Sequence, residues 1–200
     1  MAFELLGVDA VDWSSMRVGS GSPLEIPHLL QRISNPTDEH DLHLAVGRLH
    51  SIVIHEHSVS VVECSEHVIP FLIALCRCPR RSVAAHALQL MTELADCDPF
   101  WVEAEHGNHG LAARVGAALR AGLPEYGNLL LNDDPLARQA VLVLLFRLEY
   151  APEWLHRTVT DVLAVDDQRG VLDLARALLI NPAYHYEGFE LIEAALAKRR

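Results

Sequence analysis

The spacing of apolar residues constrains the fold of this chain more than any other feature. From Pro23 onward they recur at the three- and four-residue steps of one helix face, and Pro, Asn, Asp or Gly interrupts the pattern about every ten to twenty residues. Ser22 and Glu25 form a capping-box sequence, and Pro23 suits a first helical turn. The sequence therefore predicts an all-α fold, with helices near residues 23–34, 38–54, 66–77, 82–95, 111–131, 135–149, 152–165, 169–180 and 187–198.

The predicted helices form pairs, and the second helix of each pair carries one small residue that we expect to face inward. These residues are Ala45, Ala87, Ala140 and Ala175, which lie 42, 53 and 35 positions apart. Their mean separation falls within the period of about 40–47 residues that is typical of HEAT and armadillo arrays. The long middle interval predicts an inserted loop at residues 96–110. Because one amphipathic pair cannot bury its apolar face alone, the sequence predicts a short α-solenoid of about four stacked pairs.

Several segments resemble known proteins. The stretch DDPLARQAVLVLLFRL (133–148) is similar to the second helix of a HEAT repeat, with an Asp-Pro turn, an arginine soon after it and an Ala-Val pair that packs inward. VDWSSM (11–16), PLEIPHLL (23–30) and HVIPFLIAL (67–75) resemble a group of bacterial HEAT-repeat proteins that begin with a short Asp-Trp segment. The resemblance covers most of residues 9–150 and implies a right-handed α/α superhelix. Members of that group are often found beside secreted toxin modules, so the resemblance also implies an immunity protein.

Length and composition favour a single domain over residues 1–200, because half of the residues are apolar and can bury a continuous core. We expect residues 1–22 to cap one end of the solenoid and residues 151–200 to form degenerate C-terminal repeats. The start of the chain (MAFELLGVDAVDW) has no basic region followed by an apolar run, so we expect a cytoplasmic protein whose four cysteines are reduced. No apolar run approaches the roughly twenty residues that cross a bilayer, and we expect no membrane association.

The net charge of −11, with only sixteen Lys and Arg residues, argues against a nucleic-acid partner, because binding to phosphates needs a dense basic face. An acidic chain instead favours a basic protein partner. Acidic residues gather at the predicted turns, where helix capping is one explanation. In a regular stack these turns would line up along one strongly negative edge; the groups are Asp38, Glu39 and Asp41; Asp96 and Asp98; Asp133 and Asp134; and Asp166 and Asp167.

The motif His55-Glu56-His57 raises the alternative of a metal-dependent enzyme. Zinc proteases place two histidines four residues apart on one helix face, whereas here the separation is two residues. On an extended strand both imidazoles would point the same way, and Glu63 or His67 could supply a third ligand. We favour a loop between helices over a metal site, and we predict no metal, no cofactor and no catalytic residue.

The two irregular stretches, residues 55–65 and 96–110, are the preferred candidates for binding a partner. Aromatic side chains among acids suit a basic protein, because the rings supply buried area and the carboxylates supply steering. The alternative is that Phe100 and Trp101 tuck under the stack. The interpretation is an immunity protein that binds a basic toxin domain, with a regulatory scaffold as another alternative; the candidate contacts are His55, Glu56, His57, Glu63, Phe100, Trp101, Glu103, Glu105, His106, Asp133 and Asp134.

Overall fold

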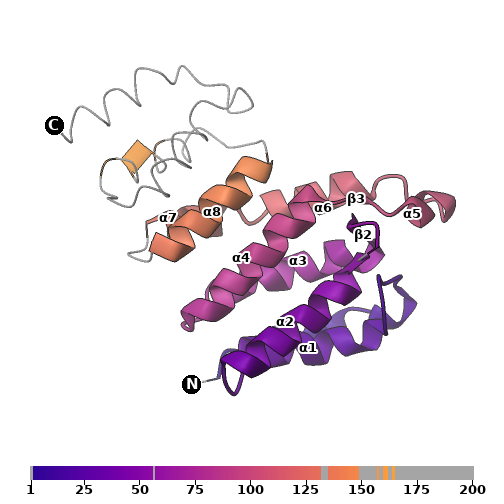
Figure 1. Ribbon diagram of the computed structural model, residues 1–200, viewed down its shortest axis with the longest axis horizontal. Coiled ribbons are helices and arrows are strands. Elements are labelled where there is room, and N and C mark those ends of the chain that lie inside the picture. Colours follow the sequence, from indigo (N-terminus) through magenta and orange to yellow (C-terminus); the bar gives the residue numbers. More distant parts are fainter. Residues whose placement is uncertain are drawn as a thin grey trace. The chain divides into compact units, whose positions relative to one another are not determined.

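The computed structural model describes residues 2–55, 57–131 and 135–148, together with residues 157, 160, 161 and 164. The described chain is mostly helical, as predicted, and its few strands are two residues long (Figure 1). It divides into two compact units, Met1–Ala121 and Gly122–Arg200, and each is described by itself. No helix among the described residues is long and apolar enough to cross a membrane.

The first unit contains three 3-10 turns, two long helix pairs, a small sheet and two further helices. In chain order these are η1 (Val8–Ala10), η2 (Trp13–Ser15), η3 (Pro23–Glu25), α1 (Ile26–Ser34), α2 (Glu39–Val53), β1 (Ile54–His55), β2 (Ser60–Val61), α3 (Glu63–Leu75), α4 (Arg81–Asp96), β3 (Asp98–Pro99), α5 (Trp101–Glu105) and α6 (Leu111–Arg120). The described part of the second unit contains α7 (Leu123–Leu130) and α8 (Pro135–Leu148), which pack against each other.

The predicted capping signals operate at the start of the first pair. The Ser22 hydroxyl accepts a hydrogen bond from the Leu24 N–H, and the Ser22 N–H donates to the Glu25 carboxylate, so the capping box is confirmed. Asp38 caps α2, because its side chain accepts the Asp41 N–H at 2.8 Å. These bonds satisfy backbone donors that a helix leaves unpaired at its start.

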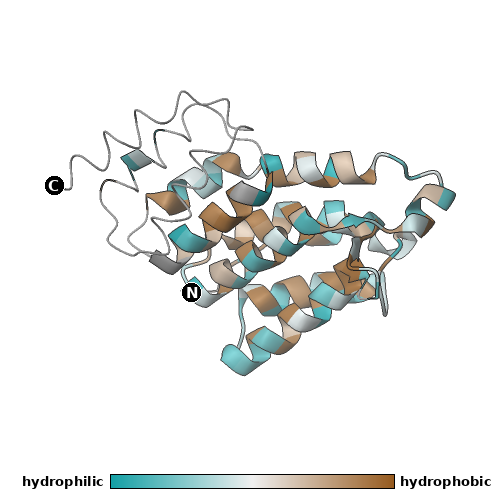
Figure 2. Ribbon diagram, turned by 45° about the horizontal axis from the view of Figure 1, so that its top comes forward, coloured by the Kyte–Doolittle hydropathy of each residue, from teal (hydrophilic) through white to brown (hydrophobic). Residues whose placement is uncertain are grey.

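The core of the first unit lies between α1 and α2, between α3 and α4, and between α6 and the pair that α3 and α4 form. Apolar and polar residues alternate along the helices in Figure 2. Ala45 and Ala87 are buried, as predicted, whereas Ala140 is only partly buried and Ala175 lies outside the described residues. The largest side chains with almost no exposed surface include Ile26, Leu30, Ile33, Leu42, Leu49, Ile52, Ile69, Leu72, Leu75 and Leu88.

Helices α2 and α4 run in the same direction, and equivalent positions lie side by side. The Ser82 hydroxyl donates to the Glu39 carboxylate at 2.8 Å, and the rings of His43 and His86 lie 4.7 Å apart. Farther along, the His50 Nε2 lies 2.9 Å from the Glu93 carboxylate. The two residues of each of these pairs are separated by 43 positions in the sequence. Three contacts between α2 and α4 therefore join residues at the same separation in the sequence.

Two predicted boundaries were wrong. The helix expected at residues 111–131 is two helices, α6 and α7, with Ala121 and Gly122 between them. Pro124 lies in the first turn of α7, where its missing N–H and its ring prevent a continuous helix. Helix α3 begins at Glu63, three residues before the predicted start, because the chain leaves the sheet directly into the helix.

Candidate functional site

The two segments expected to be irregular form one small sheet. Strands β1 and β2 make an antiparallel hairpin, which pairs Ile54 with Val61. Strand β3, from the inserted segment, pairs with β2 in parallel, and the Phe100 N–H extends the pairing by donating to the Val61 carbonyl oxygen at 2.9 Å. The backbone therefore holds the histidine-containing segment beside the aromatic residues of the insertion, although about 40 residues separate them in the sequence.

Four aromatic side chains cluster at this sheet, and we call His55, His57, Phe100 and Trp101 the aromatic platform. The His55 ring stacks on Phe100 at 4.0 Å, with 18° between the ring planes. Phe100 meets Trp101 edge-on at 5.5 Å, and His57 meets His55 in the same manner at 5.8 Å. Trp101 remains 63% exposed, so it does not tuck under the helices. The platform therefore presents a large aromatic surface on a hydrogen-bonded backbone.

The turn of the hairpin carries Val59 beside the platform in a strained conformation. Its φ angle is +47°, a left-handed conformation in which a β-branched side chain crowds its own backbone. The same side chain is 63% exposed and so gains little from burial. Burial of the Val59 side chain therefore offsets little of this strain, and strained positions of this kind cluster at functional sites.

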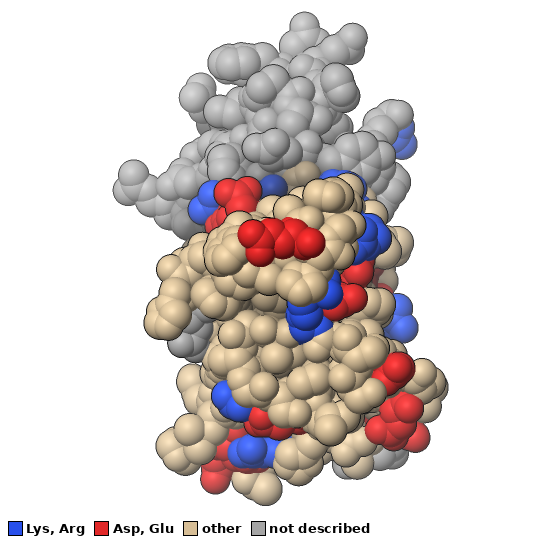
Figure 3. Space-filling view, turned by 90° about the vertical axis from the view of Figure 1, so that its right-hand side faces the viewer, with Lys and Arg blue, Asp and Glu red and all other residues tan. Residues whose placement is uncertain are grey.

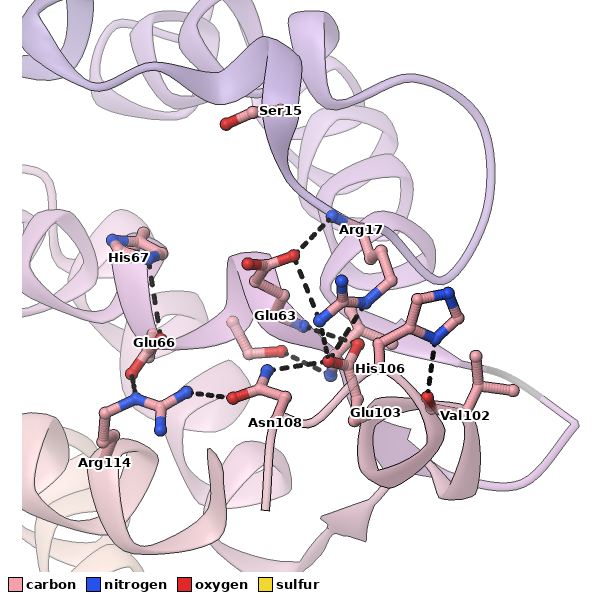
Figure 4. Close-up of polar contacts among 12 residues, drawn as sticks. Ser15, Arg17, Glu63, Glu66, His67, Val102, Glu103, His106, Asn108 and Arg114 are labelled. Carbon is pink, nitrogen blue, oxygen red and sulfur yellow. Dashed lines mark hydrogen bonds and ion pairs between the residues drawn. The ribbon is translucent and has the colours of Figure 1, made fainter. Parts of the chain in front are cut away.

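A buried carboxylate lies beneath the platform. Glu103, in the short helix α5, is 1% exposed, and its side chain accepts hydrogen bonds from three parts of the first unit (Figure 4). The Arg17 guanidinium donates at 2.6 and 3.2 Å, the Glu63 N–H at 3.1 Å and the Asn108 side-chain amide at 2.7 Å. We call these four residues the Glu103 latch. It joins the N-terminal segment, the start of α3 and the insertion.

Burial alone would raise the pKa of the Glu103 carboxyl, but the hydrogen bonds from Arg17, Asn108 and the Glu63 backbone outweigh it and hold the pKa below its usual range. The Glu63 carboxylate supports the same latch, since it accepts the Arg17 N–H at 3.1 Å and lies 3.3 Å from the guanidinium. Glu63 and Glu103, which were both predicted to contact a partner, therefore make hydrogen bonds within the protein. Glu103 in particular is not on the surface where a partner would reach it.

A second chain of polar contacts extends the latch to α6. Arg114 donates to the Glu66 carboxylate at 2.6 Å and to the Asn108 side-chain oxygen, as Figure 4 shows. Sequence reasoning did not find Arg17, Asn108 or Arg114. Their partners lie up to 86 residues away, and no local pattern marks an isolated arginine as the partner of a distant acid.

The remaining predicted residues are scattered. Glu105 and His106 are exposed at the end of α5, where the His106 Nδ1 lies 2.9 Å from the Val102 carbonyl oxygen. Glu56, Asp133 and Asp134 lie outside the described residues. The predicted acidic edge is not continuous, because Asp38 precedes α2 while Asp96 ends α4, and these helices run in the same direction. Figure 3, which views the end of the unit that carries α5, shows a mostly uncharged surface with small separate groups of acids and bases.

No metal site accompanies the histidines among the residues that the structure describes, since no group of three or more His, Cys, Asp and Glu side chains is placed to hold an ion. The His55 Nδ1 instead pairs with the Ser58 hydroxyl at 2.9 Å. Cys64, Cys76 and Cys78 are buried, and the four cysteines form no disulfide in the described structure. The geometry of this region is that of a rigid surface that presents aromatic rings.

In comparisons with known proteins, no family model matches this chain and no curated protein matches it.

Proposed function

We propose that this protein is a small HEAT-like α-solenoid that acts by binding another protein, most concretely as an immunity protein that neutralises a basic toxin domain. The observation that carries the proposal is the aromatic platform, where Trp101 is 63% exposed and Phe100 is stacked on His55. Large aromatic side chains supply much of the binding energy at protein interfaces and are enriched at their centres.

The repeat arrangement is supported by the constant separation of 43 residues between paired positions on α2 and α4. Parallel second helices at a fixed offset are what stacked helix pairs produce. A stack of this kind exposes a continuous surface and leaves its inter-helix segments free to carry recognition residues.

Rigidity favours the platform as a docking surface. The three-stranded sheet fixes the backbone of the segments that carry the platform. The Glu103 latch holds α5 in place with four hydrogen bonds. A surface that is ordered before binding loses less conformational entropy when the partner arrives. The exposed, strained Val59 next to the platform would be covered in the complex, where its burial would offset part of the strain.

The net charge of −11 supports a basic partner, because opposite charge raises the rate of encounter and disfavours acidic competitors. Asp98 and Glu105 are exposed acids on either side of the aromatic residues of the insertion in the sequence. In this mechanism the aromatic platform provides most of the binding energy, and the acids attract the basic toxin domain. The bound protein then covers the active site of the toxin.

The test is co-expression of the protein with each toxin domain encoded beside its gene, followed by calorimetric titration of the purified pair. Protection of the host and tight binding are expected for one such domain. Trp101→Ala should weaken binding about 30-fold or more, since central aromatic residues commonly contribute about 2 kcal/mol. The matched control is Leu24→Ala, which removes a side chain that is 66% exposed on η3 and should change affinity less than twofold. Absence of any protective, binding neighbour would refute the immunity proposal.

A further inference from the structure

A shallow groove runs between α2 and α4, with a volume of about 440 Å³. Its middle is apolar, since Val46 lines it from α2 and Leu90, which is 3% exposed, lines it from α4. Gly47 opens this middle part, because a Cβ at that position would meet no atom within 4 Å. The missing side chain therefore leaves room above Leu90 for a chain of methylene groups.

One end of the groove carries an oriented carboxylate. The Glu93 Oε1 accepts a hydrogen bond from the Gln89 side-chain amide at 3.0 Å, and the His50 Nε2 lies 2.9 Å from the Glu93 Oε2. These two contacts hold the carboxylate in place but use only one lone pair on each oxygen. The Glu93 side chain is 38% exposed, so the second lone pair of each oxygen is accessible to a ligand.

The other end of the groove is lined by two histidine rings. His43 and His86 meet edge-to-face at 4.7 Å, and burial, with a smaller contribution from the nearby His43, lowers the pKa of His86. None of the residues that line the groove is Lys or Arg. Glu93 is the one acid among the residues that line the groove.

We infer that this groove binds an arginine side chain from a basic segment of the partner protein. The guanidinium would donate two parallel N–H bonds to the two accessible lone pairs of Glu93, and the aliphatic stem would lie across Gly47 and Leu90. Arginine has an apolar stem, which fits the apolar middle of the groove, and a planar guanidinium that can donate two hydrogen bonds to the Glu93 carboxylate at its end. Lysine offers a point charge and can satisfy one oxygen at a time, so the groove favours arginine.

The groove leads toward the aromatic platform. α2 passes directly into β1 at Ile54, and α4 passes through Cys97 into β3. Beyond His50 and Glu93, these two segments continue to His55 and Phe100, whose rings stack on each other. A partner docked on the platform could extend a basic segment along α2 and α4, so this inference rests on the proposed function for the identity of the occupant.

The test uses the full-length ¹⁵N-labelled protein and a five-residue peptide with one arginine between leucines, blocked by acetyl and amide groups. Two matched peptides carry lysine or neutral citrulline in place of the arginine. NMR titration at pH 7.5 should place the chemical shift changes on α2 and α4. The arginine peptide should bind at least about tenfold more tightly than the citrulline peptide, as expected for a charge-assisted pair.

Two variants locate the site. Glu93→Gln should reduce affinity for the arginine peptide to that for citrulline, whereas Glu4→Gln, which removes an exposed charge from the N-terminal segment, should leave it unchanged. Gly47→Leu should fill the groove and abolish binding without loss of helix, because leucine is a better helix former than glycine.

Equal binding of the arginine and citrulline peptides, unchanged binding by Glu93→Gln, or no shift changes with about 5 mM peptide would each overturn the groove assignment. The outcome is separable from that of the proposed function. Toxin protection that depends on Trp101 can be observed when the peptides fail, and the peptides can bind when no neighbouring toxin does.

Discussion

Replacing Glu103 by glutamine should loosen two distant segments at once. The substitution keeps the size of a side chain that is 1% exposed, but it removes the negative charge that Arg17, Asn108 and the Glu63 N–H all contact. The new amide has one acceptor and two donors, so its NH₂ group must face other donors. The N-terminal segment and the insertion should therefore open more often, because both depend on the Glu103 latch.

The size of the effect follows from the contacts. Hydrogen bonds to a charged group contribute about 1.5–3 kcal/mol each, and at least two are lost. Arg17, however, is a third exposed and keeps the Glu63 carboxylate at 3.3 Å, so its charge is not left without a counterion. Water and this second acid reduce the loss to about 2 kcal/mol, which corresponds to about a 30-fold increase in opening.

Hydrogen exchange measured by mass spectrometry provides the assay, since protection reports the free energy of local opening. Peptides covering residues 10–22 and 98–110 should lose about 30-fold protection at pH 7, while peptides from α1 should not change. Glu105→Gln is the control, because it makes the same chemical change at an exposed position of the same short helix. Equal effects of the two substitutions, or a loss below threefold for Glu103→Gln, would refute the latch.

The pH dependence of the same pair has a defined sign. The pKa of Glu103 is lowered in the folded protein, so its contribution is complete above the unfolded value of about 4.3 and is lost as the pH falls through the folded value. The difference in free energy of unfolding between the natural protein and Glu103→Gln should therefore shrink below about pH 4 in urea titrations. A difference that stays constant down to pH 3 would contradict the ion pair.

Three further outcomes follow from buried or strained groups. Val59→Asn should raise the melting temperature by relieving about 1 kcal/mol of left-handed strain; no rise would mean that the turn is unstrained. Burial raises the pKa of the Cys64 thiol to about 12 and that of Cys97 to about 11, so mass spectrometry should find both slow to alkylate at pH 8 until urea is added. Trp13→Phe should cost about 2 kcal/mol in urea unfolding, because the indole N–H donates to the Val8 carbonyl oxygen at 2.8 Å inside the core; a loss below 0.5 kcal/mol would contradict this.

Much of the helical framework could be predicted because it depends on local chemistry. The capping box at Ser22, the Asp38 cap and the break after Asn35 involve residues within four positions of each other. The predicted helix 111–131 failed for an equally local reason, since Pro124 lies within it. The apolar pattern continues across Pro124, and the spacing of apolar residues does not reveal that this residue lacks an N–H.

The binding site itself stays a prediction, but the structure shows where its residues lie. The sequence identified the two segments, but it treated Glu63 and Glu103 as surface acids, whereas the structure pairs Glu103 with Arg17, which lies 86 residues away. Hydrophobic periodicity distinguishes buried from exposed positions on a helix, but it does not apply to a five-residue helix between turns. An acid there can face either way, and the outcome depends on a distant arginine.

The period of the sequence can be used not only to count helix pairs but also to predict which residues of two helices lie side by side. The mean interval between the alanines is about 43, and an offset of 43 pairs Glu39 with Ser82, His43 with His86 and His50 with Glu93, all three of which are in contact. In a parallel stack, lateral neighbours are positions one period apart, just as neighbours on one helix are three or four apart. The groove and its carboxylate could therefore have been found by aligning residues 39–53 with residues 82–96. The sheet could not, because its strands are two residues long, too short for an alternating apolar pattern to be recognised.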